Sequence, residues 1–71
     1  MFDTQRFLND QIGEPTKMEP LFRAYGMEAP RFEAVRKWYQ RGSIPADWFV
    51  LILCVIELDK GEPVRLAPYV S

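Results

Sequence analysis

The sequence predicts an all-α protein of four short helices followed by an extended C-terminal tail. Four glycines, Gly13, Gly26, Gly42 and Gly61, each follow a segment long enough for a helix, and prolines or capping residues reopen the chain after most of them. Hydrophobic residues make up 48% of the chain, including five Phe, three Tyr and two Trp, which is typical of a folded globule. With 71 residues the chain forms one domain near the lower size limit of a single core, so self-association would add stability.

The first two helices are predicted from caps and apolar spacing. The first takes Asp3 or Thr4 as its N-cap and runs to about residue 11. Its buried side is Phe7, Leu8 and Ile12. The second begins after residue 16 or at Pro20 and ends near residue 25. Both starts stay open because a proline inside a helix clashes with the carbonyl four residues earlier.

The third helix is predicted from about residue 30 to residue 41. Pro30 suits the first helical position, where a missing N–H costs nothing, and Gly42 suits the left-handed position after the last turn. On a helical wheel the apolar residues gather on one side and the polar, mostly cationic residues on the other. The inward set is Phe32, Val35, Trp38 and Tyr39, and the outward set is Glu33, Arg36, Lys37, Gln40 and Arg41.

The fourth helix, about residues 45–60, is apolar on nearly all sides. Pro45 falls in its first turn. One face is expected to pack on the other helices: Trp48, Leu51, Ile52, Val55 and Leu58. The remaining apolar residues need cover, which the first helix, the tail or a second subunit could supply. We expect a symmetric homodimer whose interface consists of Phe49, Val50, Leu53 and Ile56 from the helix, with Leu66 and Tyr69 from the tail.

Positive charge is concentrated in the third helix. The net charge of −1 argues against nucleic-acid binding by itself, but residues 31–41 carry four basic and one acidic side chain. Residues 1–30 carry three basic and five acidic side chains, and residues 42–71 carry two and four. The simplest interpretation of the basic face is a solvated surface with a Glu33–Lys37 ion pair at the i, i+4 spacing.

Catalysis, metal binding and membrane insertion have little support in the sequence. There is no histidine, and the one cysteine, Cys54, lies in the apolar fourth helix, so zinc sites and disulfide frameworks are not expected. The sequence has no histidine to act as the general base of a nucleophile, and it has no glycine-rich phosphate loop. We therefore expect neither an enzyme nor a cofactor. The first ten residues do not read as a signal peptide, and the longest apolar run, Trp48–Ile56, is about half a membrane span. We therefore expect a cytoplasmic protein.

The segment AVRKWYQRGSIPADW, residues 34–48, resembles small prophage-type regulators of the lambda repressor and Cro helix-turn-helix superfamily. A looser match extends from Leu21 to Leu58. In that family the third helix enters the major groove while the preceding helix crosses the backbone. The resemblance implies that Val35 and Trp38 are core positions of the recognition helix and that residues 42–45 form the turn into the next helix. It also places Phe32, Glu33 and Lys37 near bases, and Arg36 and Arg41 near phosphates.

Two features depart from the family pattern. The chain from Gly26 to Ala34 is about three residues longer than the family's tight turn. Phe22 stands where a small residue would let two helices cross closely.

The leading hypothesis is a sequence-specific DNA-binding transcription regulator of phage or prophage type. Residues 1–61 would form the helix-turn-helix domain and residues 62–71 the extended tail. The expected contacts with double-stranded DNA are Arg31, Glu33, Arg36, Lys37, Gln40 and Arg41. The rival hypothesis is a small helical protein-binding module that docks on a polymerase subunit or host regulator through residues 45–60 and the tail. The acidic balance outside the third helix favours the rival.

Overall fold

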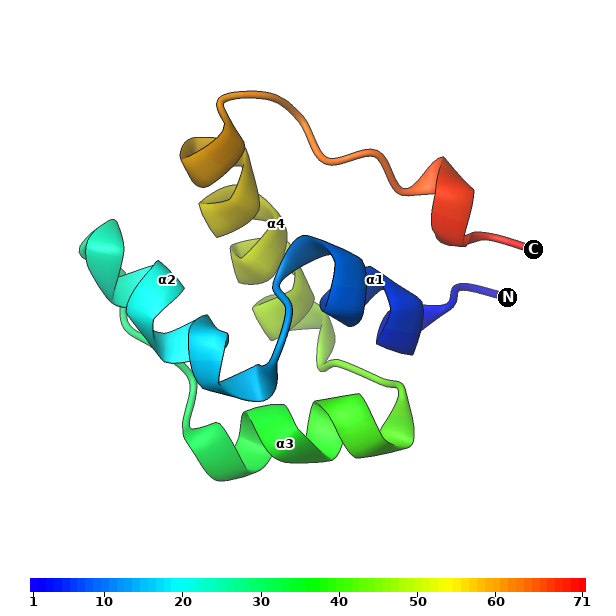
Figure 1. Cartoon of the computed structure of the whole chain (residues 1–71), viewed down its shortest axis with the longest axis horizontal. Coiled ribbons are helices and arrows are strands. Elements are labelled where there is room, and N and C mark those ends of the chain that lie inside the picture. Colours follow the sequence, from blue (N-terminus) through cyan, green and yellow to red (C-terminus); the bar gives the residue numbers. More distant parts are fainter.

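The computed structural model describes all 71 residues and confirms the all-α class. Its α-helices are α1 (Thr4–Gln11), α2 (Met18–Ala24), α3 (Phe32–Arg41) and α4 (Ala46–Lys60). Single turns of 3-10 helix span Pro15–Lys17 and Ala67–Tyr69. The only β pairing is an antiparallel bridge between Phe2 and Val70. Figure 1 shows α3 running across one end of the molecule, with α1, α2 and α4 on the same side of it and the two chain ends adjacent.

Local signals place the first two helices close to their expected positions. Asp3 is the N-cap of α1, and its carboxylate accepts a hydrogen bond of 3.1 Å from the Arg6 N–H. The chain re-enters helix through the Pro15–Lys17 turn, so the start after residue 16 is the correct alternative. Pro20 is the third residue of α2, where its missing N–H has no intrahelical acceptor to lose.

The third helix begins two residues later than predicted. Arg31 is its N-cap, with an extended backbone at ψ 140°, and Pro30 lies buried in the connection before it. The far end is as expected, because Gly42 adopts the left-handed conformation at φ 68° and its N–H donates to the Trp38 carbonyl at 2.9 Å. Phe32 was predicted to face inward, but its side chain is 46% exposed at the first turn of the helix.

The core draws on all four helices and the tail. Its buried members are Phe7, Leu8, Met18, Phe22, Val35, Trp38, Ile52, Val55, Ile56 and Tyr69. Aromatic rings organise two parts of it. Phe7 meets Tyr69 edge-on at 5.6 Å between centroids, and the Trp38 and Trp48 rings lie 5.9 Å apart. The Trp38 pair joins α3 to α4, so the position of the basic helix is fixed by the core.

The buried face of α4 differs from the predicted one. Leu51 and Leu58, expected inside, are 39% and 58% exposed, whereas Ile56, expected outside, is 1% exposed. Phe49 turns inward and packs against Phe2 and Phe7. A helix that is apolar all round has no preferred face of its own, so its neighbours decide which side is buried.

The tail packs on the rest of the chain. Tyr69 is 6% exposed, and its carbonyl accepts a hydrogen bond of 2.6 Å from the Asp3 N–H. The expected extended conformation is interrupted by the 3-10 turn that contains Tyr69. Residues 62–71 therefore contribute to the same core as residues 1–61.

Candidate nucleic-acid interface

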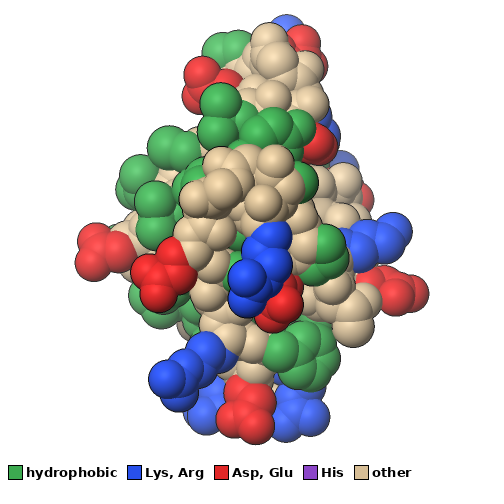
Figure 2. Space-filling view, turned by 90° about the vertical axis from the view of Figure 1, so that its left-hand side faces the viewer, with side chains coloured by type: hydrophobic (Ala, Val, Ile, Leu, Met, Phe, Trp, Pro, Cys, Tyr) green, Lys and Arg blue, Asp and Glu red, His purple; other side chains and the backbone are tan.

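All six residues predicted to contact DNA are exposed on α3 or at its N-cap. None of the four cations among them makes an ion pair, because the two ion pairs of the chain are Arg6–Asp10 and Arg23–Glu19. The interpretation of the basic face as a solvated surface included an ion pair between Glu33 and Lys37. This ion pair is absent from the structure. Figure 2 shows Lys and Arg side chains gathered with an acidic one at the end of the molecule where α3 lies.

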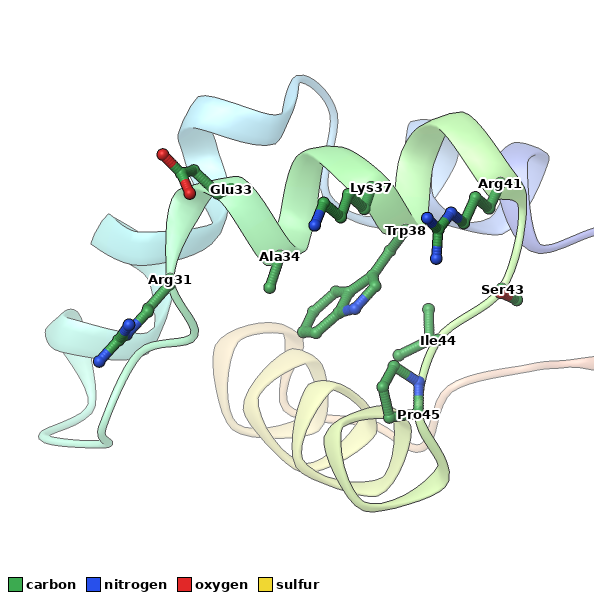
Figure 3. A pocket seen from close by; sticks show the side chains of 9 residues that line it. All are labelled: Arg31, Glu33, Ala34, Lys37, Trp38, Arg41, Ser43, Ile44 and Pro45. Carbon is green, nitrogen blue, oxygen red and sulfur yellow. The ribbon is translucent and has the colours of Figure 1, made fainter.

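A cavity of about 540 Å³ lies between α3 and the connection to α4. Its lining, drawn in Figure 3, consists of Arg31, Glu33, Ala34, Lys37, Trp38, Arg41, Ser43, Ile44 and Pro45. Four of the six predicted contact residues therefore share one cavity. Arg36 and Gln40 are exposed but do not line it, so the structure divides the predicted site between the cavity and the rest of the helix surface.

The C-terminal end of α3 is held by a side chain from α1. The Gln5 amide Nε2 donates to the Tyr39 carbonyl at 3.0 Å and to the Gln40 carbonyl at 3.2 Å. These carbonyls belong to the last turn of α3, whose carbonyls have no N–H donor within the helix. Since Gly42 binds the Trp38 carbonyl, three of the last four carbonyls of α3 are satisfied within the chain.

Tyr39 anchors the opposite side of α3. Its hydroxyl donates to the Gly13 carbonyl at 2.7 Å, and burial raises the pKa of Tyr39 to about 12. The exposed Tyr25 also has a raised pKa, first because its hydroxyl donates to the Asp59 carboxylate at 2.8 Å. The two tyrosines tie α3 to the end of α1 and α2 to the end of α4.

The connections around α3 differ in length. Seven residues, 25–31, separate α2 from α3, which is longer than the three or four residues of a tight helix-turn-helix. Four residues, 42–45, separate α3 from α4 and include the left-handed Gly42. The residues assigned by resemblance to the core of the recognition helix, Val35 and Trp38, are both buried.

The predicted dimer interface is largely occupied within the chain. Ile56 and Tyr69 belong to the core, which corrects their assignment to a free surface. Phe49, Leu53 and Leu66 are half-buried against that core. Of the six residues only Val50 is exposed, at 57%. The apolar face that α4 leaves exposed instead consists of Val50, Leu51, Cys54 and Leu58.

Sequence reasoning missed two contributors to the site. Trp38 was assigned to the core alone, although every indole carries an N–H donor that needs an acceptor or solvent. Gln5 lies 34 residues before Tyr39, and no local pattern connects them.

No family model, curated protein or solved structure matches this chain. None of its helices has both the length and the apolar composition that a membrane-spanning helix requires.

Proposed function

We propose that the chain binds double-stranded DNA through α3 and acts as a sequence-specific transcription regulator of phage or prophage type. The observation that carries this proposal is the concentration of unpaired positive charge on one exposed helix of an otherwise acidic molecule. Residues 31–41 carry four basic side chains and one acidic one, and none of these cations has an anionic partner in the chain.

The dimensions of α3 suit the major groove. An α-helix with its side chains is about 10–12 Å across, and the major groove of B-DNA is about 12 Å wide. The ten residues of α3 give it a length of about 15 Å. Arginines contact phosphates or the edges of guanine, while the Glu33 carboxylate accepts from a cytosine amino group. Releasing counterions from the phosphates would supply most of the affinity and make it depend on salt.

A homodimer accompanies this proposal. The exposed apolar face of α4, defined above by Val50, Leu51, Cys54 and Leu58, is the surface on which a second copy would pack. A two-fold axis would present two α3 helices to half-sites about 34 Å apart. Binding both half-sites together would raise affinity beyond that of one domain.

A gel-shift titration tests DNA binding. The purified protein is titrated into a duplex containing the DNA upstream of its own gene, at about 50 mM and about 200 mM salt. We expect a shift at low salt that weakens at the higher salt. The Arg36→Ala/Lys37→Ala variant should bind less tightly, with its salt dependence reduced by about one unit of slope per lost phosphate contact.

The matched control removes two cations from elsewhere. Lys17 and Arg65 are exposed, lie outside α3 and form no ion pair, so Lys17→Ala/Arg65→Ala changes the net charge equally. It should bind nearly as tightly as the unmodified protein. Equal losses in the two double variants would assign the binding to net charge and remove α3 from the mechanism. The absence of any shift at low salt would overturn the proposal.

A second candidate function follows from a different surface. An apolar cavity of about 420 Å³ lies between the start of α4 and the chain ends. Its lining is Phe2, Thr4, Ile44, Ala46, Phe49, Leu66 and Val70. Together with the exposed apolar face of α4, it favours docking of another protein through α4 and the tail. If the purified protein does not bind DNA, docking on another protein through α4 and the tail is the better-supported function.

A further inference from the structure

The cavity beside α3 contains a hydrogen-bond donor that the fold does not use. Trp38 is 6% exposed, and its indole N–H can only donate. No group of the chain accepts from it. The chain also has no fully buried side-chain nitrogen or oxygen without a partner. The unpartnered indole nitrogen of Trp38 is therefore not fully buried, and the residue that carries it lines the cavity.

Cationic groups surround this donor. Figure 3 shows the Arg41 side chain and the nitrogen-bearing edge of Trp38 directed toward the connection that carries Ser43 and Ile44. Lys37 projects along the same side of α3, and Arg31 lies at the far end of the cavity. Glu33 is the only acidic residue in the lining, so three cations face one anion.

The start of α4 adds a smaller positive contribution. Pro45 lines the cavity and is the N-cap of this fifteen-residue helix, with no side-chain cap. The first backbone bond of the helix runs from the Phe49 N–H to the Pro45 carbonyl, which leaves the preceding amides without partners in the chain. The helix dipole therefore favours an anion near this end.

We propose that this cavity binds one phosphate of the DNA backbone, with the Trp38 indole N–H and the Arg41 guanidinium donating to its non-bridging oxygens. The inference rests on the proposed function and names the chemical group that this end of α3 takes from DNA. A phosphate supplies acceptors for an unused donor and charge for unpaired cations at the same time. Trp38 then both packs in the core and binds the ligand.

Nuclear magnetic resonance of the unmodified ¹⁵N-labelled protein tests the site directly. The chain has two tryptophans, so its spectrum has two indole N–H signals, and Trp48 does not line the cavity. Trp38→Phe and Trp48→Phe assign the two signals. We expect a short duplex at low salt to move the Trp38 indole signal downfield, as hydrogen bonding to phosphate requires, while the Trp48 indole signal stays nearly in place.

The outcomes separate this inference from the proposed function. DNA binding with an unmoved Trp38 signal would overturn the phosphate site and leave DNA binding intact. A protein that binds no DNA would overturn both. Inorganic phosphate is the second probe. If it moves the Trp38 signal while duplex DNA does not, the cavity binds a free anion and the assignment to DNA is wrong.

Matched variants identify the second donor. Arg41→Gln should abolish most of the DNA-induced shift of the Trp38 indole, because the guanidinium helps to hold the phosphate. Arg36→Gln removes the same charge from the same helix, but Arg36 lies outside the cavity, so the indole shift at saturating DNA should persist. Equal indole shifts in the two variants would remove Arg41 from the site.

A conservative change at Trp38 gives an independent readout. Trp38→Phe keeps an aromatic ring in the core but removes the N–H, and should weaken DNA binding roughly tenfold. Trp48→Phe, which alters the neighbouring ring in the same core, should bind DNA as the unmodified protein does. Unchanged affinity in folded Trp38→Phe would contradict the hydrogen bond to phosphate.

Discussion

At the residue scale, single side chains fix α3 against the rest of the molecule. Gln5 satisfies two carbonyls of the last turn, and Tyr39 reaches the carbonyl that follows α1. Both contacts are polar and lie at the border of the core. They therefore orient α3 with little apolar area of their own, and their loss should affect the position of the basic face more than the existence of the fold.

Tyr39→Phe should make stability less sensitive to alkali. The unfolded chain ionises this residue near pH 10, whereas burial holds the folded pKa at about 12. The stabilisation is thus complete below pH 10 and is lost as the pH rises to about 12. At pH 7 the variant should be about 1 kcal/mol less stable, because the bond to Gly13 is lost. Urea denaturation should show this gap narrowing between pH 9 and pH 11. A gap that stays constant would contradict the raised pKa.

Gln5→Ala should loosen the end of α3. Its two hydrogen bonds are exposed, so we expect a loss of about 0.5–1.5 kcal/mol in the free energy of unfolding. Amide hydrogen exchange should become faster in the turn around Gly42. Asn9→Ala, at another exposed position of α1, is the control and should leave that turn unchanged. Equal exchange in both variants would show that the cap does not restrain α3.

At the element scale, α4 combines a buried face with an exposed apolar one. Trp48, Ile52, Val55 and Ile56 contact the core side, and the face with Cys54 near its middle remains uncovered. The chain has no other cysteine. Any disulfide that forms between copies therefore reports on this face alone.

Mild oxidation should cross-link the homodimer through Cys54. If two α4 helices pack across a two-fold axis at this face, the two cysteines near its centre come close enough for a disulfide, which needs Cα atoms within about 7 Å. A non-reducing gel should show the dimer, and Leu51→Glu, which charges the same face, should reduce its yield. Cys54→Ser controls for other cross-links. Light scattering that gives the mass of one chain at tens of micromolar would remove the homodimer from the mechanism.

At the scale of the whole molecule, the two chain ends close the core together. Phe2 packs on Phe7, Phe49 and Tyr69, and Phe2 also pairs with Val70. A domain of this size has few residues to bury, so each fully buried aromatic ring supplies a large share of its stability. The tail is therefore part of the folding unit.

Tyr69→Ala should destabilise the whole protein. Removing a buried aromatic side chain costs about 3–5 kcal/mol, which is a large part of the stability of so small a domain. Chemical denaturation should show an early transition or a mostly unfolded chain. Val70→Ala, next to it but 60% exposed, should change stability by no more than about 0.5 kcal/mol. Similar stabilities for the two variants would show that the tail does not support the core.

The sequence by itself determined the helical class, the start of α1, the C-terminal end of α3 and the charged face of α3. These depend on local chemistry: Asp3 caps α1, Gly42 ends α3 in a left-handed conformation, and the cations recur on one side of a single helix. The tertiary structure decided which face of α4 is buried and where the tail lies. Partners distant in sequence, such as Phe2 and Tyr69, make those choices, and an all-apolar helix does not encode them. Only the fold showed that Trp38 and Arg41 line one cavity, because the shape of that cavity depends on how α3 meets the start of α4.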